Sequence, residues 1–541
     1  MLARAIGWPL LAMLLFSACA APSDMADAPG AYSPGEFGLD RFNELATARG
    51  LAPNVTGHPD PGPHAFPEFG NVWAPGRIVV EDLDDDGDVD VLFSRLDGPP
   101  QAFRNVGGSF EEVPVDFGPT PEPEARQPWA TFSLVDLTSD TRPDLVFQGE
   151  AGLYLAENAG GFVFRPLREI GRLPHPGTRV HSHAWGDPDG DGDLDLWMPT
   201  MSPLGDGDGD LLPPTPETLF LNDGGELVAV NDYYRSGSAG LSILATWTDH
   251  DNDGDLDLIS FSDRGERIGV IGTAYRNQGV HDQVPVLMED GPEIGLAVGY
   301  SAMGLGKADL NEDGTLDFCV SDLGPVVCLL SSPAGWVAAG AAIGLEAPAR
   351  KSQPWVGWSL ELVDLDHDGW VDMPVVAAAA EPTLQWFGPQ EEWIQPDVMY
   401  RGGSDGFERV FMGLESSSPH PSMAAADVDG DGAQDILVAG YAAPAQLFVN
   451  QPSPGAWLTV KAVGAPGNPR GLGARVQLDG ERLRIREIDG QHALGQGPAR
   501  AHFGLGDVDN VDVTVRWPDG SQVELLGVET RQVIEVEHPD R

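Results

Sequence analysis

An acidic nine-residue segment occurs seven times in the sequence, and it restricts the possible folds more than any other feature. The copies begin at Asp82, Asp136, Asp187, Asp249, Asp309, Asp364 and Asp427. Successive starting points are separated by 54, 51, 62, 60, 55 and 63 residues. A repeat of this length indicates an architecture in which one small structural unit recurs and packs against its neighbours. The chain is therefore expected to be a repeat protein.

The first copy, DLDDDGDVD at 82–90, has the chemistry of a cation-binding loop. Carboxylates at alternate positions point into one hollow, and the glycine at position six permits a sharp turn. Like charges this close together repel, and their burial costs still more unless a cation neutralises them. Six to eight oxygen ligands suit Ca²⁺, whereas Mg²⁺ keeps several of its waters. An EF-hand would place Glu at position twelve, but Phe93 stands there, which predicts a Ca²⁺ loop between strands.

The candidate metal ligands lie at positions one, three, five, seven and nine of the complete loops. They are Asp82, Asp84, Asp86, Asp88 and Asp90; Asp187, Asp189, Asp191, Asp193 and Asp195; Asp249, Asp251, Asp253, Asp255 and Asp257; Asp309, Asn311, Asp313, Thr315 and Asp317; Asp364, Asp366, Asp368, Trp370 and Asp372; and Asp427, Asp429, Asp431, Ala433 and Asp435. In the remaining copy Asp136, Asp140 and Asp144 persist, but Thr138 replaces an acid and Thr141 replaces the glycine. About six Ca²⁺ sites are expected, and this seventh loop is equally well read as a solvated acidic turn.

Each period contains four short apolar segments of strand character. One precedes the acidic loop, such as GRIVV at 76–80, and one follows it, such as DILVA at 435–439. A third often ends in Asn, as in LFVN at 447–450, and a fourth resembles FERVFM at 407–412. Four-stranded sheets repeated around an axis form a β-propeller, in which only short strand edges are exposed. The sequence predicts an all-β fold, with a seven-bladed propeller over 42–455 and a small β domain over 456–541.

The last period lacks a fourth strand before the chain enters the C-terminal domain. FNELATARGL at 42–51 has the character of other fourth strands but precedes the first loop. Pairing of this N-terminal segment with the last blade would remove an exposed sheet edge. We therefore predict that strands from both ends of the repeat region close the ring.

The loops resemble FG-GAP/VCBS repeats, which form the propellers of integrin α-chains. Residues 456–541 resemble an ASPIC/UnbV domain through NPRGLGARV at 468–476, HFGLGD at 502–507 and VRWPDG at 515–520. Together these resemblances cover nearly the whole chain beyond its N-terminal segment and imply a bacterial relative of the cartilage acidic protein family. They imply secretion, Ca²⁺ binding and a seven-bladed propeller, but no particular biochemical activity.

The N-terminus has the pattern of an export signal. Arg4 precedes an apolar run from Ile6 to Phe16 that is too short to span a bilayer, and FSAC resembles a lipobox. We expect a lipoprotein signal peptide at 1–18, lipidation of Cys19 and a flexible tether at 19–41; cleavage after Ala20 or Ala21 is the alternative. The protein is then expected in the bacterial envelope, as an outer-membrane lipoprotein or in secreted form.

The two other cysteines, Cys319 and Cys328, flank a short turn between strands. An exported protein meets oxidising conditions, so a cross-strand disulfide is expected; two buried thiols are the alternative.

The charge balance limits the classes of partner. Formal net charge is −53, and the seven loops hold 31 of the 84 acidic residues. Such a charge argues against nucleic acid and anionic membrane surfaces as partners, and leaves the lipid anchor as the only membrane contact. We expect a monomer that recognises an extracellular protein or a glycan.

Other candidate sites carry weaker signals. His181 and His183 would share one face of a strand, with His175 nearby, and form either a metal or acid–base site or a hydrogen-bonded structural pair. Tryptophans near the loops are either core residues or a sugar-stacking platform: Trp73, Trp129, Trp185, Trp247, Trp355 and Trp358. The insert GDGDGD at 205–210 reads as a flexible loop or a further cation site.

No nucleophile, zinc-protease or phosphate-loop motif occurs in the sequence. We therefore expect a recognition or adhesion module without catalytic activity. The alternative is a Ca²⁺-dependent carbohydrate-active enzyme of the polysaccharide-lyase type, which would use loop residues such as His181 and His183.

Overall fold

The fold was analysed in a computed structural model of the chain. It describes residues 42–44, 46, 48–51, 76–95, 99–118, 131–149, 151–176, 178, 180–200, 215–233, 242–263, 272–348, 354–377, 395–410, 420–440, 445–489 and 494–541. Within these ranges nearly all regular structure is β, apart from the short helix α2 (Gly291–Ile294) and the 3-10 turn η3 (Ala341–Ile343). None of the helices in these ranges is long and apolar enough to cross a membrane.

The strands that carry the acidic loops form seven antiparallel groups of four, called units here and numbered in chain order. The fourth strands of units 2 and 3 pair in parallel and join these two units into one sheet, and unit 1 has a fifth strand from the C-terminal part of the chain. Unit 1 contains β2 (Ile78–Glu81), β3 (Asp90–Phe93), β4 (Gln101–Val106) and β5 (Ser109–Val113). Unit 2 contains β6 (Phe132–Val135), β7 (Asp144–Gln148), β8 (Gly152–Ala156) and β9 (Arg168–Arg172). Unit 3 contains β10 (Ala184–Gly186), β11 (Asp195–Met198), β12 (Glu217–Asn222) and β13 (Leu227–Tyr233). Unit 4 contains β14 (Ser242–Thr248), β15 (Asp257–Ser262), β16 (Thr273–His281) and β17 (Val284–Glu289).

The remaining units follow the same order. Unit 5 contains β18 (Gly304–Ala308), β19 (Asp317–Ser321), β20 (Val327–Leu330) and β21 (Val337–Ala339). Unit 6 contains β22 (Gly357–Leu360), β23 (Met373–Ala377), β24 (Val398–Gly403) and β25 (Gly406–Val410). Unit 7 contains β26 (Ser422–Ala426), β27 (Asp435–Ala439), β28 (Gln446–Asn450) and, from the other end of the chain, β1 (Phe42–Glu44).

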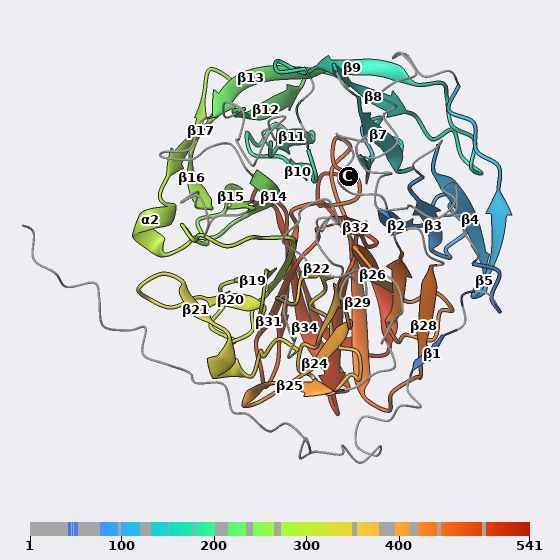
Figure 1. The fold of residues 1–541 in the computed structure, drawn as a ribbon, viewed down its shortest axis with the longest axis vertical. Coiled ribbons are helices and arrows are strands. Elements are labelled where there is room, and N and C mark those ends of the chain that lie inside the picture. The colour runs from blue at the N-terminus through green and yellow to red at the C-terminus, as the bar shows by residue number, and fades with distance from the viewer. Residues whose placement is uncertain are drawn as a thin grey trace, which may run out of the picture.

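The units are arranged around a central axis with the first strand of each nearest the centre (Figure 1). These first strands also lie against one another, β2 beside β26, β22 beside β26, and β18 beside β22. They are buried except for one half-buried residue each in β14, β18 and β26, and the small residues of SMAAA in β26 let neighbouring backbones come close. The all-β propeller predicted from the repeats is therefore confirmed.

The predicted closure by the N-terminal segment is also confirmed. β1 pairs antiparallel with β28, and Phe42 lies opposite Asn450. In the same segment Arg49 donates to the Gly108 carbonyl in unit 1 at 2.8 Å and forms an ion pair with Asp429 in unit 7 at 2.9 Å. The segment thus completes the last unit and joins it to the first.

The C-terminal domain consists of two further sheets. One contains β33 (Ala501–Gly506), β29 (Ala456–Val463) and β36 (Gln532–Glu537). The other contains β31 (Arg484–Glu487), β30 (Arg475–Asp479), β34 (Asn510–Arg516) and β35 (Gln522–Glu529). Trp517 and the apolar residues of these strands share one buried cluster with side chains of units 2 and 3, so the domain packs directly on the ring.

A short strand of the C-terminal domain enters the centre of the ring. β32 (Gly495–Gln496) pairs in parallel with β2, the innermost strand of unit 1. The Gln496 side chain bonds both the backbone N–H and the carbonyl of Leu134 in unit 2, at 2.9 and 2.8 Å. A Cβ on Gly495 would lie 1.9 Å from the Met423 carbonyl oxygen, so only glycine fits between the backbones of units 1 and 7. We refer to residues 494–500 as the central insertion.

The two cysteines lie in unit 5. Cys319 on β19 is directly opposite Cys328 on β20, their Cα atoms are 4.0 Å apart, and their sulfur atoms are bonded.

Candidate metal centres

The acidic loops all join the first and second strands of a unit, and the aspartate at position nine fixes each loop to the sheet. These seven aspartates are buried: Asp90, Asp144, Asp195, Asp257, Asp317, Asp372 and Asp435. In every unit Oδ1 accepts a bond of 2.6–2.9 Å from a backbone N–H at or just beyond the third strand. In six of the seven, Oδ2 accepts from the backbone N–H at loop position two. The ninth residue therefore holds the loop even without a cation.

The other loop carboxylates are turned inward by bonds within the loop. In the first loop the Asp82 carboxylate accepts from the Gly87 N–H at 3.0 Å, and Asp86 accepts from the Asp88 N–H at 3.0 Å. Position six has φ between +89° and +110° in the six complete loops, a conformation that favours glycine. The predicted role of the glycine is thus visible in the backbone.

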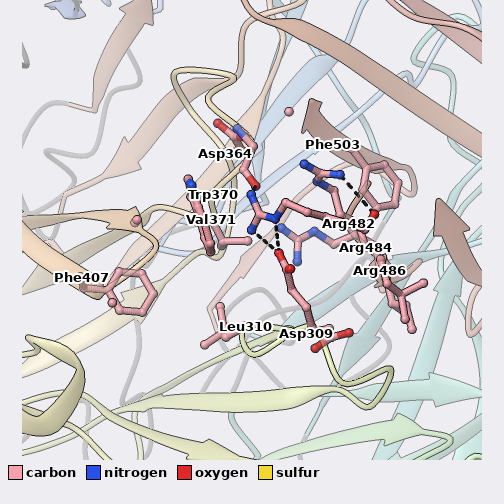
Figure 2. Close-up of a pocket in the computed structure, with 18 residues that line it drawn as sticks. Asp309, Leu310, Asp364, Trp370, Val371, Phe407, Arg482, Arg484, Arg486 and Phe503 are labelled. Atoms are coloured by element: carbon pink, nitrogen blue, oxygen red, sulfur yellow. Dashed lines mark hydrogen bonds and ion pairs between the residues drawn. The ribbon is translucent and has the colours of Figure 1, made fainter. Parts of the chain in front are cut away.

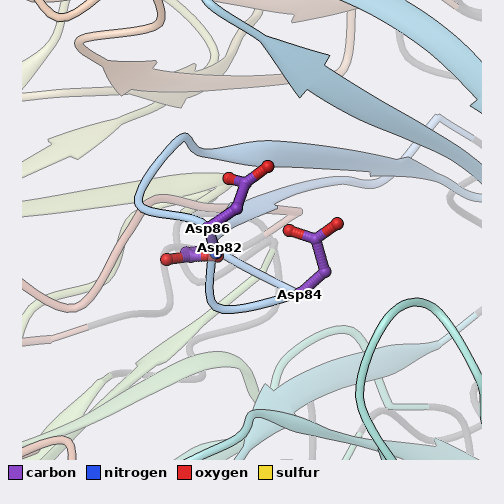
Figure 3. A group of neighbouring side chains, drawn as sticks. All are labelled: Asp82, Asp84 and Asp86. Carbon is purple, nitrogen blue, oxygen red and sulfur yellow. The ribbon is translucent and has the colours of Figure 1, made fainter.

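Five loops bring three carboxylate oxygens within 4.8 Å of one another. The groups are Asp82, Asp84 and Asp86 (Figure 3); Asp187, Asp189 and Asp191; Asp249, Asp251 and Asp257; Asp364, Asp366 and Asp372; and Asp427, Asp429 and Asp435. In all five loops at least one buried carboxylate oxygen has no hydrogen-bond partner within the protein. Examples are Oδ1 of Asp84, of Asp187 and of Asp364. Unsatisfied, converging carboxylate oxygens fit a hard cation, and the loop residues present therefore fit Ca²⁺.

Burial makes the charged forms of these carboxylates unfavourable. Burial, reinforced by neighbouring aspartates, raises the pKa of Asp195 to about 9, of Asp364 to about 8 and of Asp187 to about 7. Burial raises the pKa of Asp90 to about 8. A bound cation would favour the ionised forms and reverse these shifts.

Two loops differ from the other five. In the Asp309 loop, Asn311 replaces an acid, and the Asp313 carboxylate accepts a 2.8 Å bond from the Ser331 hydroxyl. In the Asp136 loop, the Arg142 guanidinium forms an ion pair with Asp140, and its Nε donates to the Asn158 carbonyl at 3.0 Å. Among the described residues, neither loop forms a group of three clustered acidic or histidine ligands.

The asparagines at the ends of the third strands connect neighbouring units. Asn105, Asn158, Asn277 and Asn450 each donate a side-chain bond of 2.7–3.0 Å to the carbonyl at position two of the preceding loop, in the neighbouring unit. All four are buried. The recurring Asn was visible in the sequence, but its hydrogen-bond partner is in another repeat. That partner is about 75 to 90 residues away, or at the other end of the chain for Asn105. The sequence pattern therefore did not reveal this role.

The C-terminal domain covers the loop side of the ring. Its arginines form ion pairs with residues in or beside the loops: Arg470 with Glu81, Arg482 with Glu312 and Arg516 with Asp249. Its glycines lie where backbones nearly touch; a Cβ on Gly504 would lie 1.9 Å from Asp364 Oδ2, and one on Gly467 would lie 2.0 Å from the Gly192 carbonyl oxygen. On the ring side, a Cβ on Gly432 would lie 2.1 Å from the Trp457 ring.

A buried ionic cluster holds the same interface near the centre. Lys307 on β18 pairs with Glu487 at 3.2 Å and with Asp489 at 2.9 Å. Burial alone would lower the pKa of Lys307, but the two carboxylates outweigh it and raise the pKa. Arg475 joins Glu487 at 3.2 Å and donates to the Asp249 carbonyl at 2.8 Å. The domain is thus docked through charges that lie beside the candidate metal loops.

His181 and His183 are both buried, but they lie just before β10 and not on a strand as predicted. His183 is fully buried, and its Nδ1 lies 2.9 Å from the Ser133 hydroxyl. Burial, with the nearby Arg77 charge, lowers the pKa of His183 to about 3, so the ring is neutral at physiological pH. The His181 carbonyl accepts a bond from Arg77.

The described tryptophans belong to the core. Trp185, Trp247, Trp355 and Trp358 are each at most 8% exposed, so the sugar-stacking interpretation fails for them. Trp73, Trp129, the 205–210 insert, Cys19, the predicted signal peptide at 1–18 and the tether at 19–41 lie outside the described residues.

Comparisons with known proteins agree with the repeats and the tail. Residues 82–147 and 136–198 match the family model of the FG-GAP-like repeat, and residues 464–541 match the model described as ASPIC and UnbV. No curated protein matches the chain significantly.

Solved structures resemble the chain only distantly. An Agrocybe aegerita lectin, described as recognising non-reducing terminal N-acetylglucosamine, shares 18% identity over 63% of this chain and 82% of its own, with a TM-score of 0.40. A complex of BBS1N with ARL6DN, soaked with mercury, shares 10% identity over 71% of this chain and 94% of its own, with a TM-score of 0.41. At this level of similarity neither supports a functional argument.

The FG-GAP-like match covers the first three acidic loops, and the ASPIC/UnbV match falls within the C-terminal domain. The chain thus contains FG-GAP-like repeats over 82–198, within an all-β propeller, and a C-terminal ASPIC/UnbV domain over 464–541.

Proposed function

We propose that the acidic loops bind structural Ca²⁺ and that the protein is an exported, lipid-anchored recognition module. The observation that carries the calcium proposal is the convergence of three carboxylates in each of five loops, with buried oxygens that lack partners. Each such loop joins two strands of one unit, so an ion there would stabilise the unit that holds it. Extracellular calcium modules often bind with Kd near 10⁻⁴–10⁻³ M.

Calcium content and thermal stability test this proposal together. Purified protein should bind about five to six Ca²⁺ ions by equilibrium dialysis, and EGTA should lower the Tm. At a free Ca²⁺ concentration of ten times Kd, each site contributes about 1.4 kcal/mol to the free energy of unfolding. Several sites together therefore produce a large effect. A Tm that does not respond to EGTA would contradict the proposal.

The first loop offers a matched pair of variants. Asp82→Asn removes a ligand charge, whereas Asp85→Asn changes an exposed aspartate of the same loop that lies outside the clustered group. Asp85 has φ +62°, a conformation that Asn tolerates well. Asp82→Asn should lower the number of bound Ca²⁺ ions by one, and Asp85→Asn should leave it unchanged.

The lipid anchor rests on the FSAC sequence and the short apolar run before it. In a bacterial host, labelled fatty acid should be incorporated into the wild type and not into Cys19→Ser. Equal labelling, or labelling of neither, would place cleavage after Ala20 or Ala21 instead.

The recognition proposal rests on the rigid ring and on the absence of a catalytic constellation among the residues singled out in the sequence. His181 and His183 are buried, and burial keeps the His183 ring neutral at physiological pH; in five loops three carboxylates face one another. The protein should bind a surface glycan or protein only when calcium is present and should release it unchanged. Shortened glycan or cleaved protein after incubation, lost in one point variant outside the loops, would favour the enzyme alternative.

A further inference from the structure

A cavity of about 70 Å³ lies where units 5 and 6 meet the C-terminal domain. Figure 2 shows that three arginines from one edge of that domain, Arg482, Arg484 and Arg486, converge on it. The opposite walls come from the Asp309 and Asp364 loops and from the aromatic rings of Trp370 and Phe407. The cavity therefore brings three guanidinium groups together with three acidic side chains, Asp309, Glu312 and Asp364.

The three arginines differ in how well their charges are compensated. Arg482 is fully engaged: it pairs with Glu312, donates to the Gly369 carbonyl at 2.9 Å and lies 3.4 Å above the Trp370 ring. Arg484 makes one long bond, 3.4 Å to the Arg482 carbonyl, and its Nε is buried without a partner. Arg486 has no hydrogen bond or ion pair with any residue that the structure describes.

Arg484 and Arg486 remain charged in this environment. The charge of Asp364 favours both guanidinium groups, with Glu312 for Arg484 and Asp309 for Arg486, but none of these carboxylates forms an ion pair with them. Burial lowers the pKa of Arg486 to about 10, and burial together with the Arg482 charge lowers that of Arg484. The guanidinium ends of Arg482 and Arg484 also lie near each other, since a Cβ on Gly369 would be 2.9 Å from one and 3.4 Å from the other. Like charges brought together without a counterion are costly in a protein interior.

We propose that this cavity binds a small oxyanion, such as a sulfate or carboxylate group, held by Arg484 and Arg486. The planar guanidinium presents paired N–H donors that match two oxygens of such a group, and charge-assisted bonds of this kind are among the strongest in proteins. The inference is independent of the proposed recognition function, since it concerns charge balance at a junction between domains.

The size of the cavity restricts the ligand to a small group. A water molecule needs roughly 10–15 Å³ of such volume, so the cavity holds about five water-sized positions. Sulfate and acetate have four or five heavy atoms and fit this space. A whole sugar ring does not fit, so a sugar could enter only through an acidic substituent.

The acidic residues in the wall set a condition for binding. Glu312 is already paired with Arg482, but Asp309 and Asp364 would repel an anion if they were ionised and uncompensated. Both are first residues of candidate calcium loops, so an oxyanion should bind best when calcium is present. Binding is therefore measured on calcium-loaded protein, and one parallel titration in EGTA tests the effect of removing calcium.

The probes are sodium sulfate and sodium acetate, titrated at constant ionic strength against sodium chloride. Calorimetry and Tm should show saturable binding to the wild type. Arg486→Met should weaken binding at least tenfold. It should not lower the Tm in chloride buffer without sulfate or acetate, because Arg486 makes no hydrogen bond or ion pair with the described residues. Arg531→Gln is the matched control, since that arginine belongs to the same domain but pairs with Asp509 at the surface, and it should bind like the wild type.

The result that overturns the proposal is the absence of saturable binding, or equal binding by wild type and Arg486→Met. If Arg486→Met does not fold, Arg486→Lys keeps the charge but loses the paired donors, and it should still weaken binding. A titration with glucose 6-sulfate identifies the source of the bound oxyanion. If it binds as tightly as sulfate, the site accepts the acidic group of a sugar. If only sulfate binds, the site holds a free structural ion. Both outcomes support the site.

Discussion

The Asp136 loop and the Asp364 loop occupy equivalent places in units 2 and 6, yet they neutralise their carboxylates differently. In unit 6, three buried aspartates converge, and Asp364 keeps an oxygen without a partner. In unit 2, the Arg142 guanidinium pairs with Asp140, and the Thr138 hydroxyl donates to Asp144 at 3.1 Å. The unit 2 loop thus supplies a positive charge from its own position seven. In unit 6 Arg401, on the third strand, pairs with Asp366 at 2.8 Å and with Asp368 at 3.0 Å, and leaves Asp364 and Asp372 without an ion pair among the described residues.

The comparison separates two functions of the motif. The aspartate at position nine, Asp144 or Asp372, accepts hydrogen bonds from two equivalent backbone N–H groups in both loops. One is at loop position two and the other lies at or just beyond the third strand. The attachment of the loop to its sheet therefore does not require a metal. The requirement for a cation comes from the first, third and fifth positions. Of these only the third differs between the two loops, Thr138 against Asp366, and at position seven Arg142 stands where unit 6 has Trp370.

The largest expected difference between the loops is in the pH dependence of the calcium-free protein. Burial raises the pKa of Asp364 to about 8 but that of Asp136 only to about 6. A carboxyl whose folded pKa is raised contributes stability that is complete below its unfolded pKa, near 4, and is lost as pH rises through the folded value. Burial also raises the pKa of Asp195 to about 9 and that of Asp90 to about 8. The free energy of unfolding in EGTA should therefore fall by on the order of 5 kcal/mol between pH 5 and pH 9.

Urea denaturation in EGTA at several pH values measures this trend. Asp364→Asn removes one ionisable group and should raise stability at pH 9 more than Asp136→Asn does. Calcium-free protein that grew more stable with rising pH would show that the carboxylates are compensated in some other way.

The next largest effect is expected at position nine. Asp372→Ala and Asp144→Ala should each destabilise the protein by about 3 kcal/mol, because each leaves two buried backbone N–H groups without an acceptor. Guanidinium denaturation should give similar losses in calcium and in EGTA for Asp144→Ala. A loss for Asp144→Ala that disappeared in EGTA would show that the unit 2 loop binds calcium after all.

A redesign of the unit 2 loop tests the role of Arg142 directly. Arg142→Met alone should lower stability by about 1–2 kcal/mol, since it leaves Asp140 without its partner. The triple variant Thr138→Asp, Thr141→Gly, Arg142→Asp copies the pattern of the first loop and should bind one more Ca²⁺ than the wild type by equilibrium dialysis. Unchanged stoichiometry would mean that the surroundings of the loop, and not its sequence, exclude the ion.

The smallest effect is expected from the backbone at position six. Thr141 has φ +77°, where the complete loops have glycine. Thr141→Gly should relieve this strain and raise the free energy of unfolding by about 1 kcal/mol. Thr138→Ser, which keeps the hydroxyl and a normal backbone, serves as the control and should change stability little.

The sequence predicted those features that repeat within one unit. The loop carboxylates, the glycine turn and the four-strand period could all be recognised locally, and the unpaired last unit pointed to closure by residues 42–51. The role of Arg142 was missed because the residue type at position seven varies among the loops. An arginine at that position therefore did not stand out as an exception.

Features that depend on a partner far along the chain were not predictable. The tryptophans before the loops were compatible with an exposed or a core position, and only the packing of neighbouring units decided between them. The sequence predicted a C-terminal β domain, but its arginines gave no sign of which loop each would meet. Gly504, within the FGLG motif, is small because Asp364 of unit 6 lies against it, a contact that no local pattern encodes.

The seam between units 7 and 1 has a consequence for the order of biosynthesis. β1, among the first parts of the ring to leave the ribosome, cannot pair until β28 has been made, about 400 residues later. The central insertion, which lies between β2 and β26, emerges later still. A chain that stops short of residue 495 therefore lacks the strand that joins units 1 and 7 at the centre of the ring, so closure has to wait until most of the chain has been made.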